Sequence, residues 1–272
     1  MNQQKGIKRF FADFKKFFPL LLNLAGKDFK LKYRRSILGV LWSILNPLLT
    51  MIIITRVFGI LLKVQVENFA TYYLLGYTLW TFFSESTTNS MSSIVSGAPL
   101  IKKVYIPKYV FPVEKCLFSL INFGFSLIAV LLVMLLQGVY PTPVSLLVFL
   151  PVLYCFLFCV GFSLILSALT VYFRDIMHLY SVLLTIWMYL TPIIYPMSIL
   201  KDHDKAIAIV HCNPMYYFVE YFRAVMMHGS DPIAYPVPSF AFNMICLAIG
   251  LGTLVLGGLV FSRAQKRFIL HI

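Results

Sequence analysis

The sequence carries little charge for its length. Only 12% of its 272 residues are charged, and acidic residues are the scarcer kind, with 10 against 23 basic ones. Soluble domains carry about 25% charged residues, so this chain has too few to cover a water-exposed surface. The 60% apolar content and the mean hydropathy of +0.85 agree with this. The composition excludes soluble, disordered and collagen-like classes and indicates a membrane protein.

Several motifs of catalysis and metal binding are also absent. The sequence has no G-x-x-x-x-G-K-[ST] phosphate-binding loop, no H-E-x-x-H and no G-x-S-x-G. The five cysteines form no C-x-x-C pair and the five histidines are scattered, so neither a metal site nor a disulfide framework is predicted. We therefore expect a chain that is not an enzyme, that binds no cofactor of its own and that has no ATPase site.

Long apolar runs are plentiful. Crossing about 30 Å of hydrocarbon takes roughly 20 residues in a helix, and six stretches qualify. They are Ile37–Leu62, Phe69 to about Ser90, about Tyr109 to Leu136, Val144–Val171, about Leu179 to Leu200, and about Pro238 to Phe261. Ten basic residues precede the first stretch. Because basic residues concentrate in the cytoplasm, the sequence predicts an all-α membrane protein with six transmembrane helices and both termini cytoplasmic.

The N-terminal segment has a different pattern. Residues 7–25 are too short and too basic for a seventh span, but their phenylalanines recur at helical spacing, which predicts an amphipathic helix on the inner leaflet. No A-x-A-like cleavage site follows, which disfavours a signal peptide. We expect residues 1–36 to form this interface helix and a basic approach to the membrane, 37–262 the transmembrane domain, and 263–272 a cytoplasmic tail.

Two of the expected spans contain unusual polar features. In the first, Asn46-Pro47 removes a backbone donor and frees a carbonyl, which predicts a kink beside a cavity. The second turns polar at residues 84–93, and a carboxylate such as Glu85 costs about 3 kcal/mol at membrane depth. This half faces a wet cavity or a partner, or its hydroxyls bond back to their own helix where the span ends. The sequence leaves both interpretations open.

A broken segment is predicted between the fifth and sixth spans, because two prolines four residues apart interrupt a helix. Asn213-Pro214 then provides a helix cap and a first-turn proline, and Glu220 and Arg223 are spaced as an i,i+3 pair. We expect this re-entrant segment to close the outer side; an aromatic interfacial belt is the alternative. The expected outer-gate residues are Pro192, Pro196, Asn213, Pro214, Glu220 and Arg223.

Two short loops, at residues 97–108 and 171–176, mix apolar and charged residues. They form either a docking surface for a soluble partner or solvated loops whose charges only set the topology.

Five of these features occur in order along the chain. They are YRRSILGVLWSILNP at 33–47, LIKKVYIP at 100–107, VYFRDI at 171–176, PIIYP at 192–196, and Asn213-Pro214 followed by Glu220 and Arg223. Together they resemble the membrane subunit of ATP-binding-cassette exporters for polysaccharides, the permeases for lipid-linked O-antigen, teichoic acid and capsular glycans. The resemblance runs from about Tyr33 to Arg223. Many relatives have Phe at the position of Ile106, a small departure.

The resemblance implies a homodimer in the bacterial cytoplasmic membrane, surrounded by membrane lipid. It implies two copies of a separate cytoplasmic ATPase that holds ATP and Mg²⁺, a lipid-linked polysaccharide as substrate, and no nucleic acid. The residues it implies for contact with the ATPase are Lys102, Lys103, Tyr105, Arg174 and Asp175.

The resemblance also implies a channel lined by aromatic residues, which support the apolar faces of sugar rings without holding them tightly. The expected lining residues are Trp42, Tyr77, Trp80, Trp187, Tyr189 and Tyr195. Near the N-terminal helix, a basic group would hold the pyrophosphate of the lipid carrier, or would serve only anionic lipid or topology. Its members are Lys30, Lys32, Arg34 and Arg35, with Lys27 beside them.

Three other functions compete with this one. One is a non-transporting membrane scaffold, which would not require the polar half of the second span. A drug or small-lipid exporter of the same transporter type would share the architecture but not the aromatic, proline-broken fifth span. A membrane-bound glycan- or lipid-modifying enzyme would need acids or histidines clustered at one interface, and the sequence scatters them.

Overall fold

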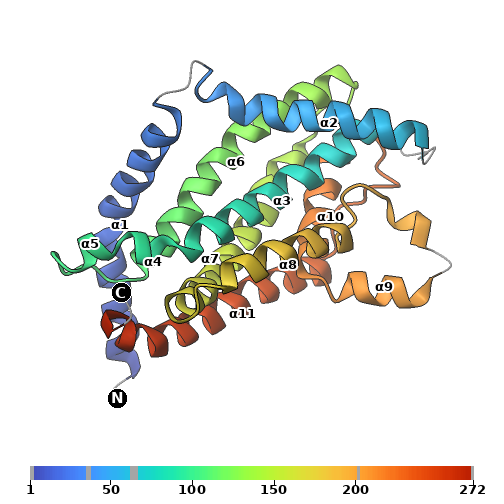
Figure 1. Ribbon diagram of the computed structural model, residues 1–272. Coiled ribbons are helices and arrows are strands. Elements are labelled where there is room, and N and C mark those ends of the chain that lie inside the picture. Colours follow the sequence, from blue (N-terminus) through green and yellow to red (C-terminus); the bar gives the residue numbers. More distant parts are fainter. Residues whose placement is uncertain (1–2, 35–37, 62–66, 201–202, 271–272) are drawn as a thin grey trace.

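The computed structural model describes residues 3–34, 38–61, 67–200 and 203–270, and within these ranges it contains helices and no strands. The helices, shown in Figure 1, are α1 (Gln3–Tyr33), α2 (Leu41–Leu61), α3 (Phe69–Met91), α4 (Ser93–Ser96), α5 (Ala98–Ile101), α6 (Val110–Leu136), α7 (Phe149–Tyr172), α8 (Ile176–Leu190), α9 (Asp204–His211), α10 (Pro214–Met227) and α11 (Phe240–Ala264). Short 3-10 helices cover Pro143–Val148, Met197–Leu200 and Gln265–Leu270 (η1, η2 and η3).

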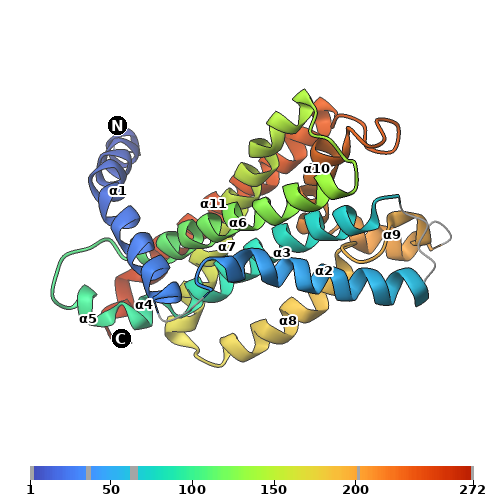
Figure 2. The ribbon, with the colours of Figure 1, turned by 90° about the horizontal axis from the view of Figure 1, so that it is seen from above.

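The long helices form an elongated bundle. Helix α3 packs between α6 and α7, α11 packs along α7, and α2 lies against α3 and α6. Helix α1 stands at a steep angle to the others at one end (Figures 1 and 2). The same end carries α4, α5, the turn between α7 and α8, and η3. We call it the basic end, since its exposed loops include Lys102, Lys103 and Arg174.

Four helical stretches are long and apolar enough to cross a membrane: Leu41–Gly59, Val110–Leu136, Pro143–Tyr172 and Phe240–Phe268. They correspond to the first, third, fourth and sixth expected spans. Helix α3, at the second, is 23 residues long but is polar in its second half, and α8, at the fifth, has only 15 residues. The all-helical class is therefore confirmed, whereas the count of six spans stays a prediction.

Helix α1 is longer than the predicted amphipathic segment and contains Pro19. It is attached to α6, because the Phe29 ring stacks on Phe125 with centroids 5.5 Å apart and Lys115 forms an ion pair with Asp28. Its position on a membrane surface stays a prediction. The predicted domain boundaries also stay untested, although α11 continues two residues past residue 262.

Helices α7 and α11 approach each other at the level of the backbone. A Cβ added at Gly161 would lie 2.3 Å from the carbonyl oxygen of Thr253, and one added at Gly257 would lie 2.1 Å from the carbonyl oxygen of Gly161. Only glycine fits at such a crossing, and small residues are how membrane helices pack most closely. This pair therefore forms a rigid side of the bundle.

The segment after α11 is bonded to both loops of the basic end. Lys108 Nζ donates to the carbonyl of Gln265 at 2.7 Å, and the Tyr172 hydroxyl donates to the carbonyl of Ala264 at 2.8 Å. The buried Phe268 ring packs edge-on against Tyr172 with centroids 6.0 Å apart. The residues before α6, the end of α7 and the end of α11 are thus joined.

Candidate functional site

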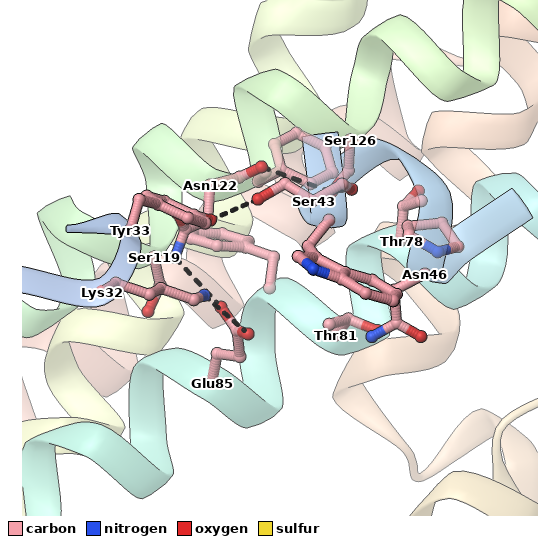
Figure 3. A pocket seen from close by; sticks show the side chains of 14 residues that line it. Lys32, Tyr33, Ser43, Asn46, Thr78, Thr81, Glu85, Ser119, Asn122 and Ser126 are labelled. Carbon is pink, nitrogen blue, oxygen red and sulfur yellow. Dashed lines mark hydrogen bonds and ion pairs between the residues drawn. The ribbon is translucent and has the colours of Figure 1, made fainter. Parts of the chain in front are cut away.

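Two neighbouring hollows lie between α1, α2, α3 and α6, and both are lined by Lys32 and Glu85. The first, of about 340 Å³, extends toward Trp42 and Asn46 on α2 (Figure 3). The second, of about 650 Å³, extends to Ser96 near the basic end. Because the two share an ion pair at their junction, we treat them as one feature, the polar groove.

The polar groove is made by two stripes of polar side chains. Along α3 and α4 the stripe has members three or four residues apart, which places them on one helix face: Thr78, Thr81, Glu85, Asn89, Ser92 and Ser96. Along α6 the matching stripe is Lys115, Ser119, Asn122 and Ser126. Since α3 and α6 pack together, the two stripes enclose the groove.

A loose chain of polar contacts crosses the groove from helix to helix. Lys32 Nζ lies 3.6 Å from Glu85 Oε1, Asn122 Nδ2 donates to Glu85 Oε2 at 3.4 Å, and the Tyr33 hydroxyl donates to Asn122 Oδ1 at 3.3 Å (Figure 3). The Tyr33 hydroxyl is also hydrogen-bonded to Ser43 Oγ. Distances above about 3.2 Å are long for protein hydrogen bonds. Glu85 and Asn122 therefore hold Lys32, Tyr33 and each other weakly.

The proline of α2 contributes to the same place. Pro47 lies inside α2 and cannot donate to the carbonyl of Ser43, four residues earlier. Ser126 Oγ donates to that carbonyl at 3.3 Å. The sequence predicted that Asn46-Pro47 would free a carbonyl beside a cavity, and both residues line the groove.

Each interpretation of the polar half of α3 holds for one of its faces. Glu85 and Asn89 face the groove. On the opposite, buried face, Thr87 donates to the carbonyl of Phe83 at 2.8 Å and Ser90 to that of Ser86 at 2.6 Å. The Tyr180 hydroxyl from α8 also donates to Thr87 at 2.7 Å. One face therefore opens on a hollow, while on the other Thr87 and Ser90 are bonded internally and the Ser86 hydroxyl has no partner among the described residues.

The predicted break after α8 is held by Arg223. Helix α8 ends at Leu190, and Arg223 on α10 donates to the carbonyl of Pro192 at 2.7 Å and to that of Ile193 at 3.1 Å. Its Nε donates to the carbonyl of Tyr72 at 3.2 Å, and its guanidinium lies 3.5 Å from the centre of the Tyr72 ring. Arg223 is fully buried. It replaces the helical hydrogen bonds that the prolines remove.

Asn213 is the second residue that holds this break. Its Oδ1 accepts from the Met215 amide at 3.0 Å, which is the predicted helix cap, and from Trp187 Nε1 at 2.7 Å. Its Nδ2 donates to Thr191 Oγ1 at 2.8 Å. Pro214 occupies the first turn of α10, as predicted.

The predicted pair of Glu220 and Arg223 is also present, at 3.0 Å. The half-buried Pro196 follows the break. We call Arg223, Asn213 and the residues they bind the clamp; its place on the outer side of a membrane stays a prediction.

The six predicted channel aromatics lie in three places. Trp42 is 48% exposed at the rim of the polar groove. Tyr77, Trp80 and Trp187 pack inside the bundle, and Trp80 is only 5% exposed, with its ring 6.3 Å from that of Trp187. Near the break, the Tyr195 hydroxyl donates to the carbonyl of Tyr189 at 3.1 Å. Within one chain these six residues share no common path, and their channel role stays a prediction.

The predicted basic group near the N-terminal helix is spread out. Lys30 and Arg34 are exposed, while Lys32 is paired with Glu85 inside the groove. Arg35 lies outside the described residues. The predicted ATPase-contact residues are all exposed at the basic end, on the segment after α5 and on the α7–α8 turn: Lys102, Lys103, Tyr105, Arg174 and Asp175.

Sequence reasoning missed Ser119, Asn122 and Ser126, which form the α6 wall of the groove. Their signal was present, since polar residues recur at four- and three-residue spacing along an otherwise apolar helix. Among the described residues, no three His, Cys, Asp or Glu side chains gather as a metal site.

Comparison with known proteins identifies the family. Residues 19–227 match the ABC-2 type transporter family, a range that includes both the polar groove and the clamp. The chain is 32% identical over 228 residues to the O-antigen export system permease protein RfbA of Myxococcus xanthus, covering 84% of this chain and 88% of that protein. It is 28% identical over 253 residues to a protein of the same name from Klebsiella pneumoniae, covering 92% and 94%. The chain therefore belongs to the ABC-2 type transporter family.

Proposed function

We propose that this chain is the permease subunit of an exporter that moves a lipid-linked polysaccharide, an O-antigen or a similar glycan, across the bacterial cytoplasmic membrane. ATP hydrolysis on a separate ATPase subunit drives the transport. The names of the relatives support this proposal, and the polar groove is the structural observation that carries it. A stripe of amides, hydroxyls and one carboxylate on an apolar bundle is costly unless a polar substrate or water uses it.

The groove favours a glycan over a drug or a small lipid. Sites for hydrophobic molecules are lined mainly by apolar and aromatic side chains with few polar groups. Beside apolar residues, the first hollow also has Ser43, Thr81, Glu85, Asn122 and Ser126 around it. Several of the bonds that these groups make with one another are long, and a polyhydroxylated substrate can replace them, whereas a drug cannot.

The proposal includes the arrangement in the membrane. Six spans cross the bilayer. They are the four long apolar stretches, α3, whose second half is polar, and α8 with its broken extension, which is apolar but short. The basic end faces the cytoplasm, and the clamp closes the outer side. Two copies of the chain enclose the channel, because the exposed faces of α2 and α8 carry large apolar side chains that need lipid or a second copy to cover them.

ATP-driven closure of two ATPase subunits would act on the exposed loops at the basic end. Tyr105 is 91% exposed, and Arg174 and Asp175 are exposed on the α7–α8 turn. These residues precede the helices α6 and α8. A push on them would tilt whole helices as rigid bodies, the usual form of such transitions.

The proposal is tested in cells that lack their own O-antigen export permease. The chain is expressed with and without an ABC-type P-loop ATPase subunit from the same organism, and surface polysaccharide is measured by immunoblot. We expect surface glycan only when both proteins are present. In proteoliposomes, lipid-linked glycan should stimulate ATP hydrolysis more than hydrophobic drugs do. Stimulation by drugs alone, without surface glycan, would assign the chain to the drug-exporter class.

The loop assignment has its own test. Arg174→Ala or Asp175→Ala should separate ATP hydrolysis from export while the protein still inserts in the membrane. Lys205→Ala, exposed on α9 at the far end of the bundle, is the matched control and should export normally. Normal export by both loop variants would remove this part of the proposal.

A further inference from the structure

We infer that the polar groove is a binding site for sugar rings, built within a single chain and using only Trp42 of the six aromatic residues predicted to line the channel. The inference rests on the proposed function, since it names the place where the glycan of that substrate would bind. Four observations support it: an unpartnered hydroxyl, a weakly bonded polar wall, an exposed indole and a balanced charge.

Ser119 supplies the unpartnered hydroxyl. It is 0% exposed on α6, its side chain lines the first hollow, and its Oγ has no hydrogen-bond partner among the described residues. Buried polar groups are almost always paired, so each exception calls for an explanation such as a missing ligand. A sugar hydroxyl is both donor and acceptor, and it would satisfy Ser119 Oγ once a side chain of the loosely bonded wall moves aside, because that oxygen has no surface exposed to the hollow.

The polar side chains beside Ser119 make long bonds with one another, which a ligand could replace. Asn122 and Glu85 are joined at 3.4 Å and Glu85 and Lys32 at 3.6 Å. An amide has both a donor group and an acceptor group, and a carboxylate accepts several bonds at once. Neighbouring hydroxyls on one sugar ring present the complementary pattern. Shorter bonds to such a ring would replace the long ones that these three side chains make with each other.

Trp42 supplies a surface for the apolar face of a sugar. It lines the first hollow, and it is 48% exposed. An aromatic ring offers a flat apolar surface with a polar edge. The hollow thus combines one flat surface with hydrogen-bonding groups on the other walls. Its volume of about 340 Å³ falls within the range of small-ligand pockets, about 300–1,000 Å³.

The charge of the groove points to a neutral ligand. The first hollow contains one cation, Lys32, and one acid, Glu85. The second adds one cation and one acid, Lys115 and Asp28, which form an ion pair. A phosphate or pyrophosphate site needs an excess of donors with positive charge, and here each ammonium already faces a carboxylate. The groove therefore suits an uncharged sugar ring better than the carrier's pyrophosphate.

The test uses the three tryptophans of the chain as separate probes. The full-length protein is labelled with 5-fluorotryptophan, placed in lipid nanodiscs without the ATPase, and studied by ¹⁹F NMR, with the resonance of Trp42 assigned from Trp42→Phe. The probes added are the methyl glycosides of glucose, mannose, galactose, rhamnose and N-acetylglucosamine, and sodium pyrophosphate. We expect at least one glycoside to shift the Trp42 resonance saturably while the buried Trp80 resonance stays in place.

Substitutions on the wall then locate the site. Ser119→Ala should weaken glycoside binding about two- to tenfold, the effect of one hydrogen bond, without lowering the melting temperature, because the hydroxyl it removes has no partner in the protein. Ser119→Leu fills the hollow and should abolish the shift. Thr81→Val should weaken binding, whereas Thr185→Val should not. Both threonines bond to the carbonyl four residues back, but only Thr81 lines the groove.

The outcomes separate this inference from the proposed function. A Trp42 shift with pyrophosphate and with no glycoside would make the groove an anion site, and no shift with any probe would leave it without a ligand of either class; both results overturn the inference. A glycoside shift that persists in Ser119→Leu also overturns it. If the wild-type chain exports glycan in cells in any of these cases, the proposed function stands. If the groove binds glycosides but cells export nothing, the proposed function fails alone.

Discussion

Arg223 and Lys32, two of the basic side chains that enter the helical bundle, are used in opposite ways. Arg223 is fully buried, and its guanidinium donates to three backbone carbonyls and to Glu220 at 2.7–3.2 Å. The Lys32 side chain is 39% exposed and faces one carboxylate at 3.6 Å. The first uses four of its five N–H donors within the protein and is buried out of reach of a ligand. The second keeps spare capacity, which is what a binding site requires.

The same contrast divides the bundle. On the α7–α11 side, backbones touch through Gly161 and Gly257, and no space remains. On the α1–α2–α3–α6 side, polar residues surround hollows. Close backbone packing stabilises the α7–α11 side. On the α1–α2–α3–α6 side, polar groups with long hydrogen bonds surround space for a substrate. Substitutions on the two sides should therefore affect different measurements.

The largest effect is expected at Arg223. Arg223→Met should lower the free energy of unfolding by about 3–5 kcal/mol, because it leaves buried carbonyls and Glu220 without their partner. The measurement is the melting temperature of the detergent-solubilised protein, followed by fluorescence-detected size exclusion. Arg56→Met, at an exposed position on α2, is the control and should melt close to the wild type. Equal melting of the two variants would show that the clamp does not hold the break.

The next largest effect is expected at the glycines where α7 and α11 cross. Gly257→Ala should destabilise by about 1–3 kcal/mol through overpacking, since its Cβ would meet the backbone of Gly161 at 2.1 Å. Gly258→Ala is a matched control one residue away, because a Cβ there meets nothing within 4 Å. The difference in melting temperature between the two variants measures the α7–α11 contact directly, and its absence would mean that the helices do not cross here.

A smaller loss is expected at Asn213. Asn213→Ala removes the cap of α10 and the bond to Trp187, and should cost about 1–2 kcal/mol. Asn213→Asp keeps both acceptor bonds and loses the donations to Thr191 and to the carbonyl of Leu190, so it should retain more stability than the alanine variant. The reverse order in thermal melting would assign the stabilisation to these donations.

The smallest effect on stability is expected in the groove. Glu85→Gln should change the free energy of unfolding by no more than about 1 kcal/mol, since partly exposed ion pairs contribute about 0–1 kcal/mol. It should nevertheless alter surface glycan export in cells. A melting temperature that falls as far as that of Arg223→Met would show that Glu85 stabilises the fold as Arg223 does. It would contradict the difference proposed between the clamp and the groove.

Local features were predictable from the sequence because they depend on neighbouring residues. The cap at Asn213, the end of the helix before Pro192 and the Glu220–Arg223 pair all involve side chains within a turn of one another or fixed backbone chemistry. The apolar length of the spans is equally local. For these features the structure confirms the expectation.

Contacts between distant segments could not be predicted in the same way. The carbonyl of Tyr72 that Arg223 binds is 151 residues away along the chain. The groove needs α1, α2, α3 and α6 at once, so neither polar stripe alone identified it. The predicted channel aromatics show the same limit. The residue type of Trp80 suggested contact with sugar, but the packing of distant helices buries it in the core.

The attachment of the segment after α11 has a mechanical consequence. Through Lys108, Tyr172 and the Phe268 ring, this segment acts as a brace between the two loops of the basic end. A displacement of either loop is transmitted to the other. If both loops contact a soluble subunit, they would therefore move together. A fusion tag joined directly to residue 264 in place of the brace would uncouple them, and tagged versions of the protein should keep residues 265–270.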